Sequence, residues 1–140
     1  MQKVWTRKSN PYVIVINDTL TDMNKQLMLN DYIASSDGIK GKVIILYTDA
    51  IVIKDDNGEE YWLVPSTAKP IPLTDEWMRE HNVLAIAEKN HCNLDFSRKH
   101  RLKVILTSGD GTTQITYYFP KPQYVHELQH ILRQFNEIEL

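Results

Sequence analysis

The chain has 140 residues and a formal net charge of -2 at pH 7, with 42% hydrophobic and 24% charged residues. These values are typical of one globular domain and exclude a general attraction to nucleic acid or anionic membranes, although they permit a local basic patch. A single cysteine, Cys92, excludes an internal disulfide and fits a reducing compartment. No signal-peptide segment and no apolar run near the ~20 residues that span a bilayer occur, so we expect a cytoplasmic protein without membrane contact.

The first half of the chain, residues 12–69, is rich in short apolar runs that favour β-strands. Runs of β-branched and aromatic residues occupy 12–16, 41–47, 51–53 and 61–64, and residues 26–33 alternate weakly. The Asn57-Gly58 pair between two of these runs is typical of a tight hairpin turn. Strands at this spacing predict a small curled antiparallel barrel of SH3-like size.

A segment with two prolines, Pro70 and Pro72, separates this half from a predicted helix. Proline disfavours a regular central strand and biases the residue before it toward an extended conformation. Thr74 is placed to cap a helix whose first turn carries two acidic residues, the sign that a helix N-terminus prefers. Leu73 and Met78 have the spacing of a hydrophobic staple. The segment therefore predicts a joint between two structural parts.

The second half, residues 70–140, predicts a helix, a hairpin and a second helix. After the first helix the state of residues 83–87 is undecided. Runs at 102–106 and 113–119 flank the turn Ser108-Gly109-Asp110-Gly111 and predict the hairpin. Apolar residues recur at helical spacing over residues 123–135. We therefore expect an α+β fold in which both halves share one core, with residues 1–140 forming a single domain.

Two sequence motifs resemble a family of small proteins encoded by phages, prophages and mobile elements of Bacteroidetes. Residues 70–77, Pro-Ile-Pro-Leu-Thr-Asp-Glu-Trp, are similar to the family's "IPLTEEWL" segment, and residues 124–129, Tyr-Val-His-Glu-Leu-Gln, to its closing helix. Residues 30–33 and 41–43 are similar to its strand-rich region, so the resemblance covers roughly residues 26–140. It implies a phage accessory, virion or host-takeover protein, and it carries no catalytic residue to this chain.

The closing helix contains His126-Glu127-Leu128-Gln129-His130, which has the spacing of the H-E-x-x-H zinc motif. On a helix, His126 and His130 would share one face and bind zinc, and Glu127 would act as general base on the bound water. This pattern defines a zinc hydrolase hypothesis with Glu127 as catalytic residue and zinc as cofactor.

Other features of the same helix argue against a zinc site. The apolar stripe places His126 and His130 on the opposite side with Gln129 and Arg133, where we expect them to face solvent unless another layer covers them. A third ligand with recognisable spacing is missing, and the resembling family has an amide residue where His130 stands. We therefore interpret the motif as a polar helix face and expect no cofactor.

Three groups of residues are candidates for a binding surface. Trp62 belongs to a set of aromatic residues of which most are expected in the core. Arg98, Lys99, Arg101 and Lys103 form the one basic cluster, which contacts phosphates or is a solvated loop. Gln129 and Arg133 lie on the polar face of the last helix. The acidic run at 55–60 is interpreted as a hairpin turn with solvating charge.

The preferred hypothesis is a non-enzymatic phage or mobile-element accessory protein that binds or assembles with a host or phage protein, in the host cytoplasm or in the virion. The alternative is a small β-barrel that binds nucleic acid through the basic cluster. The zinc hydrolase is the third and least favoured hypothesis. The negative net charge favours protein over nucleic acid as the partner.

Overall fold

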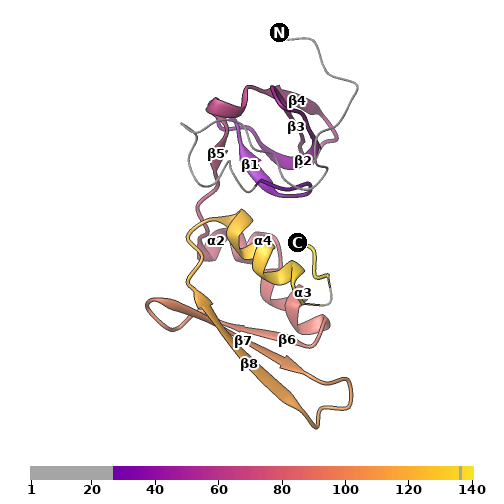
Figure 1. Cartoon of the computed structure of the whole chain (residues 1–140), viewed down its shortest axis with the longest axis vertical. Helices are drawn as coiled ribbons and strands as arrows, with labels where there is room; N and C mark the ends of the chain where they lie inside the picture. The colour runs from indigo at the N-terminus through magenta and orange to yellow at the C-terminus, as the bar shows by residue number, and fades with distance from the viewer. Residues whose placement is uncertain (1–26, 136) are drawn as a thin grey trace. The chain divides into compact units, whose positions relative to one another are not determined.

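The computed structural model describes residues 27–135 and 137–140, and in it the chain divides into two compact units, residues 1–71 and 72–140. Figure 1 colours the strands of the first unit from indigo to magenta and the second unit from pink to yellow. The class is α+β, as predicted, and the boundary falls in the proline-containing joint. The strand predicted at residues 12–16 lies outside the described residues, and a core shared by the two halves stays a prediction.

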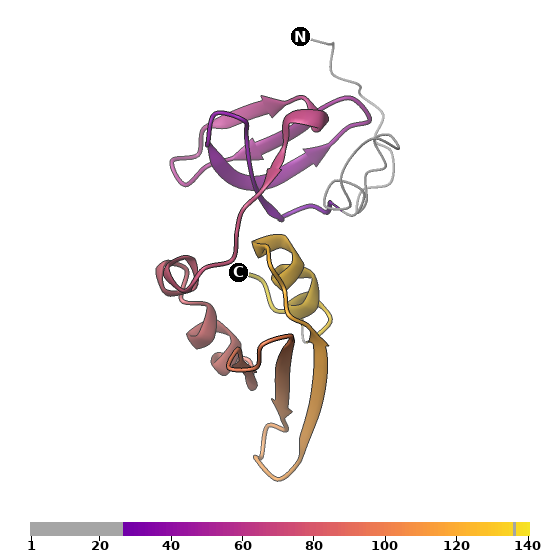
Figure 2. The same cartoon turned by 90° about the vertical axis from the view of Figure 1, so that its left-hand side faces the viewer.

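Unit 1 contains one antiparallel sheet of five strands in the order β4-β3-β2-β1-β5 (Figure 2). Among the described residues, β4 and β5 are the two edges of this sheet, and it does not close on itself. The elements are β1 (Tyr32–Ala34), β2 (Lys40–Leu46), β3 (Ile51–Lys54), β4 (Glu60–Leu63), the short 3-10 helix η1 (Pro65–Thr67) and β5 (Lys69–Pro70).

The core of unit 1 is built around the interior strand β3, whose first three residues, Ile51–Ile53, are fully buried. Leu27, Ile33, Val43 and Leu63 are among the buried residues that pack with it. The β3–β4 hairpin turns at Gly58, with φ of 82°, a conformation that glycine adopts without strain. The Asp55 Oδ1 atom accepts hydrogen bonds from the backbone N–H groups of Asn57 and Glu59. The predicted hairpin is therefore confirmed.

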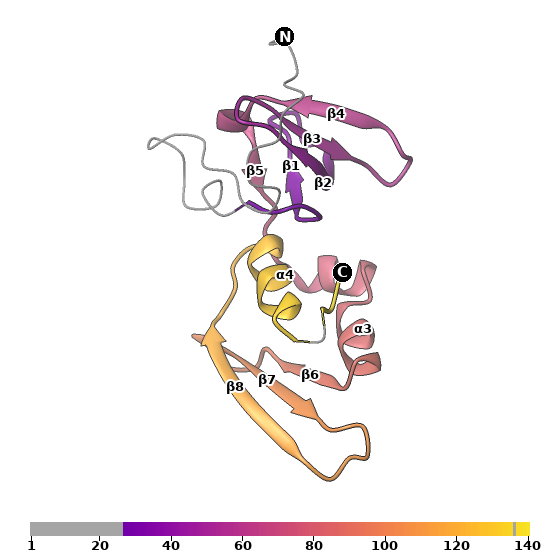
Figure 3. The same ribbon diagram turned by 45° about the vertical axis from the view of Figure 1, so that its right-hand side comes forward.

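Unit 2 contains a three-stranded antiparallel sheet in the order β6-β7-β8 and three α-helices. In Figure 3 the helices α3 and α4 lie on one side of this sheet, and its other side carries no helix of unit 2. The elements are α2 (Asp75–Glu80), α3 (Val83–Lys89), β6 (Cys92–Asp95), β7 (Arg101–Thr107), β8 (Gln114–Pro120) and α4 (Val125–Arg133).

In unit 2, the helix N-cap and the β-hairpin that were predicted from the sequence are both present. The Thr74 hydroxyl accepts a hydrogen bond of 3.0 Å from the Trp77 N–H, so the predicted N-cap is confirmed. The undecided residues 83–87 belong to α3, and β7 and β8 form the predicted hairpin. Strand β6 was not predicted. It exists through pairing with β7, where Leu94 lies opposite Val104.

The two faces of the unit 2 sheet differ in character. Leu102 and Val104 point to the helix-covered face and are fully buried. The Phe135 ring, which follows α4, lies 5.1 Å from the Tyr117 ring and 5.8 Å from the Phe119 ring. Because side chains alternate along a strand, the residues between these positions point to the opposite face. That face carries the charged residues of β7.

Candidate functional site

The basic cluster predicted from sequence gathers around one exposed tyrosine on the uncovered face of the unit 2 sheet. The guanidinium carbon of Arg98 lies 5.4 Å from the centre of the Tyr118 ring, and that of Arg101 lies 5.8 Å from it. Lys103 is the cross-strand partner of Tyr118, so the two side chains are neighbours on one face. We call this set, Arg98, Lys99, Arg101, Lys103 and Tyr118, the basic sheet face.

The β6–β7 loop that carries Arg98 and Lys99 is held by hydrogen bonds at its start. The Asp95 Oδ1 atom accepts from the Ser97 hydroxyl at 2.6 Å and from the Ser97 N–H at 2.9 Å. These two hydrogen bonds, and after them the charges of Arg98 and Lys103, lower the pKa of Asp95 below its ordinary value. The carboxylate therefore stays ionised and keeps the turn closed at neutral pH.

Lys121 holds the same loop from the other end of the hairpin. Its ammonium group donates to the backbone oxygens of Phe96 at 2.8 Å and Arg98 at 2.9 Å, and its backbone N–H donates to the His100 oxygen at 3.0 Å. Sequence reasoning missed Lys121, because a lysine between two prolines gives no local signal of a contact more than 20 residues away. It is a positioning residue for the basic sheet face.

A second candidate surface lies on unit 1 at the edge strand β4. The Trp62 ring stacks on the Tyr47 ring at 5.8 Å with an interplanar angle of 9°, and Trp62 is 40% exposed. Val64, directly after β4, is 54% exposed. Tyr61 instead packs against the core, as the alternation along the strand requires. We call Tyr47, Trp62 and Val64 the aromatic patch.

The histidine pair of α4 does not have the surroundings predicted for it. His126 and Gln129 are only 3% and 1% exposed, so these two side chains are covered and do not face solvent. A helical wheel gives the direction of a side chain but not what covers it, and α4 is buried on more than its apolar stripe. Gln129 is therefore removed from the predicted binding surface.

The rest of the zinc motif is engaged in helix structure. The Glu127 carboxylate accepts hydrogen bonds from the backbone N–H groups of Gln123 and Tyr124, at 2.9 and 3.0 Å, and so stabilises the start of α4. The rings of His126 and His130 are 5.7 Å apart and nearly perpendicular. Among the described residues no three His, Cys, Asp or Glu side chains are grouped to hold a metal ion.

Arg133, the last residue of the predicted polar face, is mostly buried and paired. Its Nε atom donates to the Glu139 carboxylate at 2.9 Å, and the arginine side chain is 14% exposed. This ion pair ties the end of α4 to the residues that follow it. Arg133 therefore offers little surface to a partner, whereas Arg98 and Arg101 are exposed.

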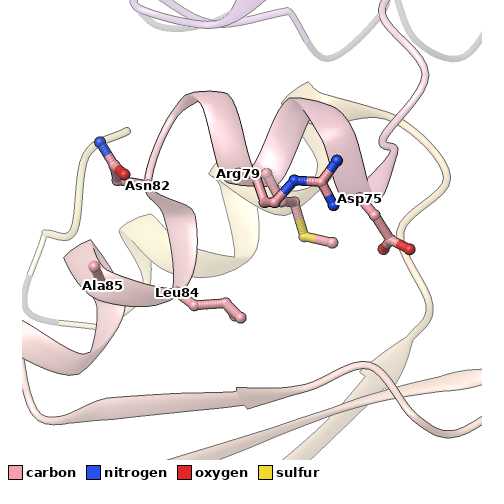
Figure 4. Close-up of a pocket in the computed structure, with 6 residues that line it drawn as sticks. Asp75, Arg79, Asn82, Leu84 and Ala85 are labelled. Atoms are coloured by element: carbon pink, nitrogen blue, oxygen red, sulfur yellow. The ribbon is translucent and has the colours of Figure 1, made fainter.

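Two surface hollows of unit 2 lie over α2 and α3 and beside the basic sheet face, respectively. One of about 410 Å³ lies over α2 and α3 and is lined by Asp75, Met78, Arg79, Asn82, Leu84 and Ala85 (Figure 4). Its lining holds one carboxylate and one guanidinium, without a histidine or a nucleophile beside them. Another, of about 550 Å³, adjoins the basic sheet face and is lined by Leu73, Lys99, His100, Pro120, Lys121, Pro122 and Gln123.

Comparison with protein families, with curated proteins and with solved structures finds no match to this chain. Within the part of the chain that the structure describes, no helix is long and apolar enough to cross a membrane. The basic sheet face and the aromatic patch are therefore the features of the molecule that bear on function.

Proposed function

We propose that this protein is a non-enzymatic binding module that acts through an exposed surface and not through a pocket, and that its partner is another protein. The observation that carries the proposal is the aromatic patch, in which the half-exposed Trp62 ring is held parallel to Tyr47. Tryptophan and tyrosine are the residues most often responsible for the affinity of protein interfaces.

The geometry of the patch supports this role. Trp62 lies on β4, which has no neighbouring strand on its outer side among the described residues, and Val64 extends the apolar surface along the same segment. Stacking on Tyr47 restricts the ring before binding, which lowers the entropy lost when a complex forms. A ring that becomes fully desolvated in such an interface contributes on the order of 2 kcal/mol.

The charges beside the patch favour protein over nucleic acid as the partner of unit 1. The β3–β4 hairpin carries Asp55, Asp56, Glu59 and Glu60, all within a few residues of Trp62. Carboxylates at this density repel a phosphate backbone and attract basic side chains. The expected partner surface is therefore apolar at its centre and basic at its rim.

Two finer statements belong to the same proposal. We place the five-stranded sheet of unit 1 in the SH3-like class, supported by its size and its antiparallel order β4-β3-β2-β1-β5. The phage or mobile-element context, and with it a place of action in the host cell or the virion, rests on the sequence resemblance.

The test is affinity purification of the tagged full chain from bacterial host cells, with and without nuclease, followed by titration of the captured protein. Replacing Trp62 by threonine keeps a strand-forming residue and removes the ring. Loss of about 2 kcal/mol corresponds to roughly 30-fold weaker binding, measured by calorimetric titration.

The matched control is Leu84→Gln, which removes an exposed apolar side chain from α3 and is expected to leave binding unchanged. The proposal would be overturned if Trp62→Thr bound the captured protein with unchanged affinity. It would also be overturned if nuclease treatment removed every captured protein.

A further inference from the structure

The positive charge of unit 2 is concentrated on its sheet. Residues 92–121 carry five lysines and arginines and two aspartates. Among the charged residues in the rest of the unit, acidic side chains outnumber basic ones. Asp95 lies opposite Lys103 and accepts hydrogen bonds from Ser97, so it offsets one of these positive charges. Asp110 lies in the β7–β8 turn, at the opposite end of the hairpin from the β6–β7 loop. The basic sheet face therefore has a local cationic field that the net charge of the chain conceals.

The two arginines of this face, Arg98 and Arg101, contact an aromatic ring and form no ion pair with a carboxylate among the described residues. Both guanidinium groups lie against the Tyr118 ring, an interaction of about 0.5–1 kcal/mol at an exposed site. A cation–π contact restrains the side chain and leaves its charge and N–H donors available to an anion.

Beside these cations, the same face carries uncharged residues toward the β7–β8 turn. Tyr118 is 47% exposed, Thr116 and Gln114 follow it outward along β8, and Ile105 lies opposite Thr116 on β7. A row of cations beside aromatic and apolar surface matches a nucleic-acid strand, which has phosphates along one side and unpaired bases along the other. A duplex hides its bases and offers this face only phosphates.

We propose that the basic sheet face is a binding site for single-stranded nucleic acid, a second activity separate from the aromatic patch of unit 1. Arg98, Arg101 and Lys103 contact consecutive phosphates, and Tyr118 with its β8 neighbours contacts the bases. Lys121 acts as a positioning residue, because its two hydrogen bonds to loop carbonyls fix the backbone that presents Arg98.

The first test measures binding of the full chain to a fluorescein-labelled oligothymidylate of about 20 nucleotides by fluorescence anisotropy, over a salt series beginning at about 50 mM. Three phosphate contacts predict a slope of log affinity against log salt of about -2 for a single strand. Reversing one charge with Arg101→Glu is expected to weaken binding at least tenfold.

The matched control is Arg79→Glu, which makes the same change of charge on the exposed surface of α2, outside the basic sheet face. We expect less than a twofold effect. An equal loss in Arg79→Glu and Arg101→Glu would show a diffuse attraction to the whole chain and overturn the site. Absence of binding at the lowest salt would overturn it as well.

Two further variants separate the role of the ring from the stability of the strand. Tyr118→Phe keeps the cation–π surface and is expected to bind within twofold of the wild type, whereas Tyr118→Thr keeps a strand-forming residue and is expected to lose about fivefold or more. Circular dichroism reports whether each variant is folded. Equal binding by Tyr118→Thr, or tighter binding to a duplex of the same length, would overturn the single-strand proposal.

Discussion

Each unit has an exposed aromatic residue, Trp62 in unit 1 and Tyr118 in unit 2, and the charges around these two residues have opposite sign. Described residues 27–71 carry seven acidic and four basic side chains, and Trp62 lies next to the acidic β3–β4 hairpin. Residues 92–121 have the reverse balance, and Tyr118 lies under two guanidinium groups. The comparison teaches that the net charge of -2 is a poor guide to the partner, because the field at a surface is set by charges within about a Debye length.

The units also differ in how their sheets are buried. In unit 1, all three residues Ile51–Ile53 of the interior strand β3 are fully buried, on both faces of the sheet. In unit 2 the middle strand β7 buries Leu102 and Val104 on one face and leaves Arg101 exposed on the other. A sheet with one open face retains surface for binding, and it tolerates substitution on that face.

The largest expected effect tests this difference in burial with the same substitution in each unit. Ile53→Ala in β3 removes a fully buried side chain and is expected to lower the free energy of unfolding by about 2–5 kcal/mol. Ile115→Ala in β8 affects a residue that is 51% exposed, and we expect a loss under about 1 kcal/mol. Urea denaturation followed by circular dichroism measures both. Equal losses would mean that this exposed position of β8 is as tightly packed as the core of unit 1.

Much of this architecture could be predicted from sequence where the signal is local. The Asn57-Gly58 turn, the Thr74 cap and the β7–β8 hairpin depend on a few adjacent residues whose conformational preferences agree with the fold. Strand β6 could not be predicted, because Cys92–Asp95 has no strand pattern of its own and gains its structure from β7.

The candidate sites were predictable only in part for the same reason. The basic cluster is visible as a run in the sequence, but its contact with Tyr118 depends on the register between β7 and β8. The clamp by Lys121 depends on the path of the chain between distant segments. The helical wheel of α4 did not show that His126 and Gln129 are covered, because amphipathicity predicts one buried face and α4 has more than one.

A smaller effect tests whether the basic loop is ordered by Lys121. Lys121→Met keeps most of the apolar stem and removes the ammonium group that donates to the Phe96 and Arg98 oxygens. Since both carbonyls are near solvent, we expect a loss of about 1 kcal/mol in the free energy of unfolding, together with faster amide hydrogen exchange over residues 96–100.

Lys99→Met provides the matched control, because Lys99 is exposed and its amine makes no hydrogen bond to the loop backbone among the described residues. We expect a change within about 0.5 kcal/mol. If exchange over residues 96–100 is as slow in Lys121→Met as in the wild type, the loop is ordered by the Asp95–Ser97 turn alone, and Lys121 has no positioning role.

The smallest effect concerns the carboxylate at the far end of the basic hairpin. The Asp110 Oδ1 atom accepts hydrogen bonds from the Ser108 hydroxyl and from both the N–H and the hydroxyl of Thr112, and these bonds lower the pKa of Asp110 from 3.8 to about 2. Because the folded-state pKa is the lower one, the unfolded chain binds more protons between these values. The contribution of Asp110 to stability is therefore present above about pH 4 and is lost as the pH falls through about 2.

We expect the urea midpoint of the wild type to exceed that of Asp110→Asn at pH 5, and the difference to shrink toward pH 2. Other carboxylates titrate alike in both proteins and cancel in the comparison, so a difference that stays constant with pH would show that Asp110 stabilises the turn without its charge.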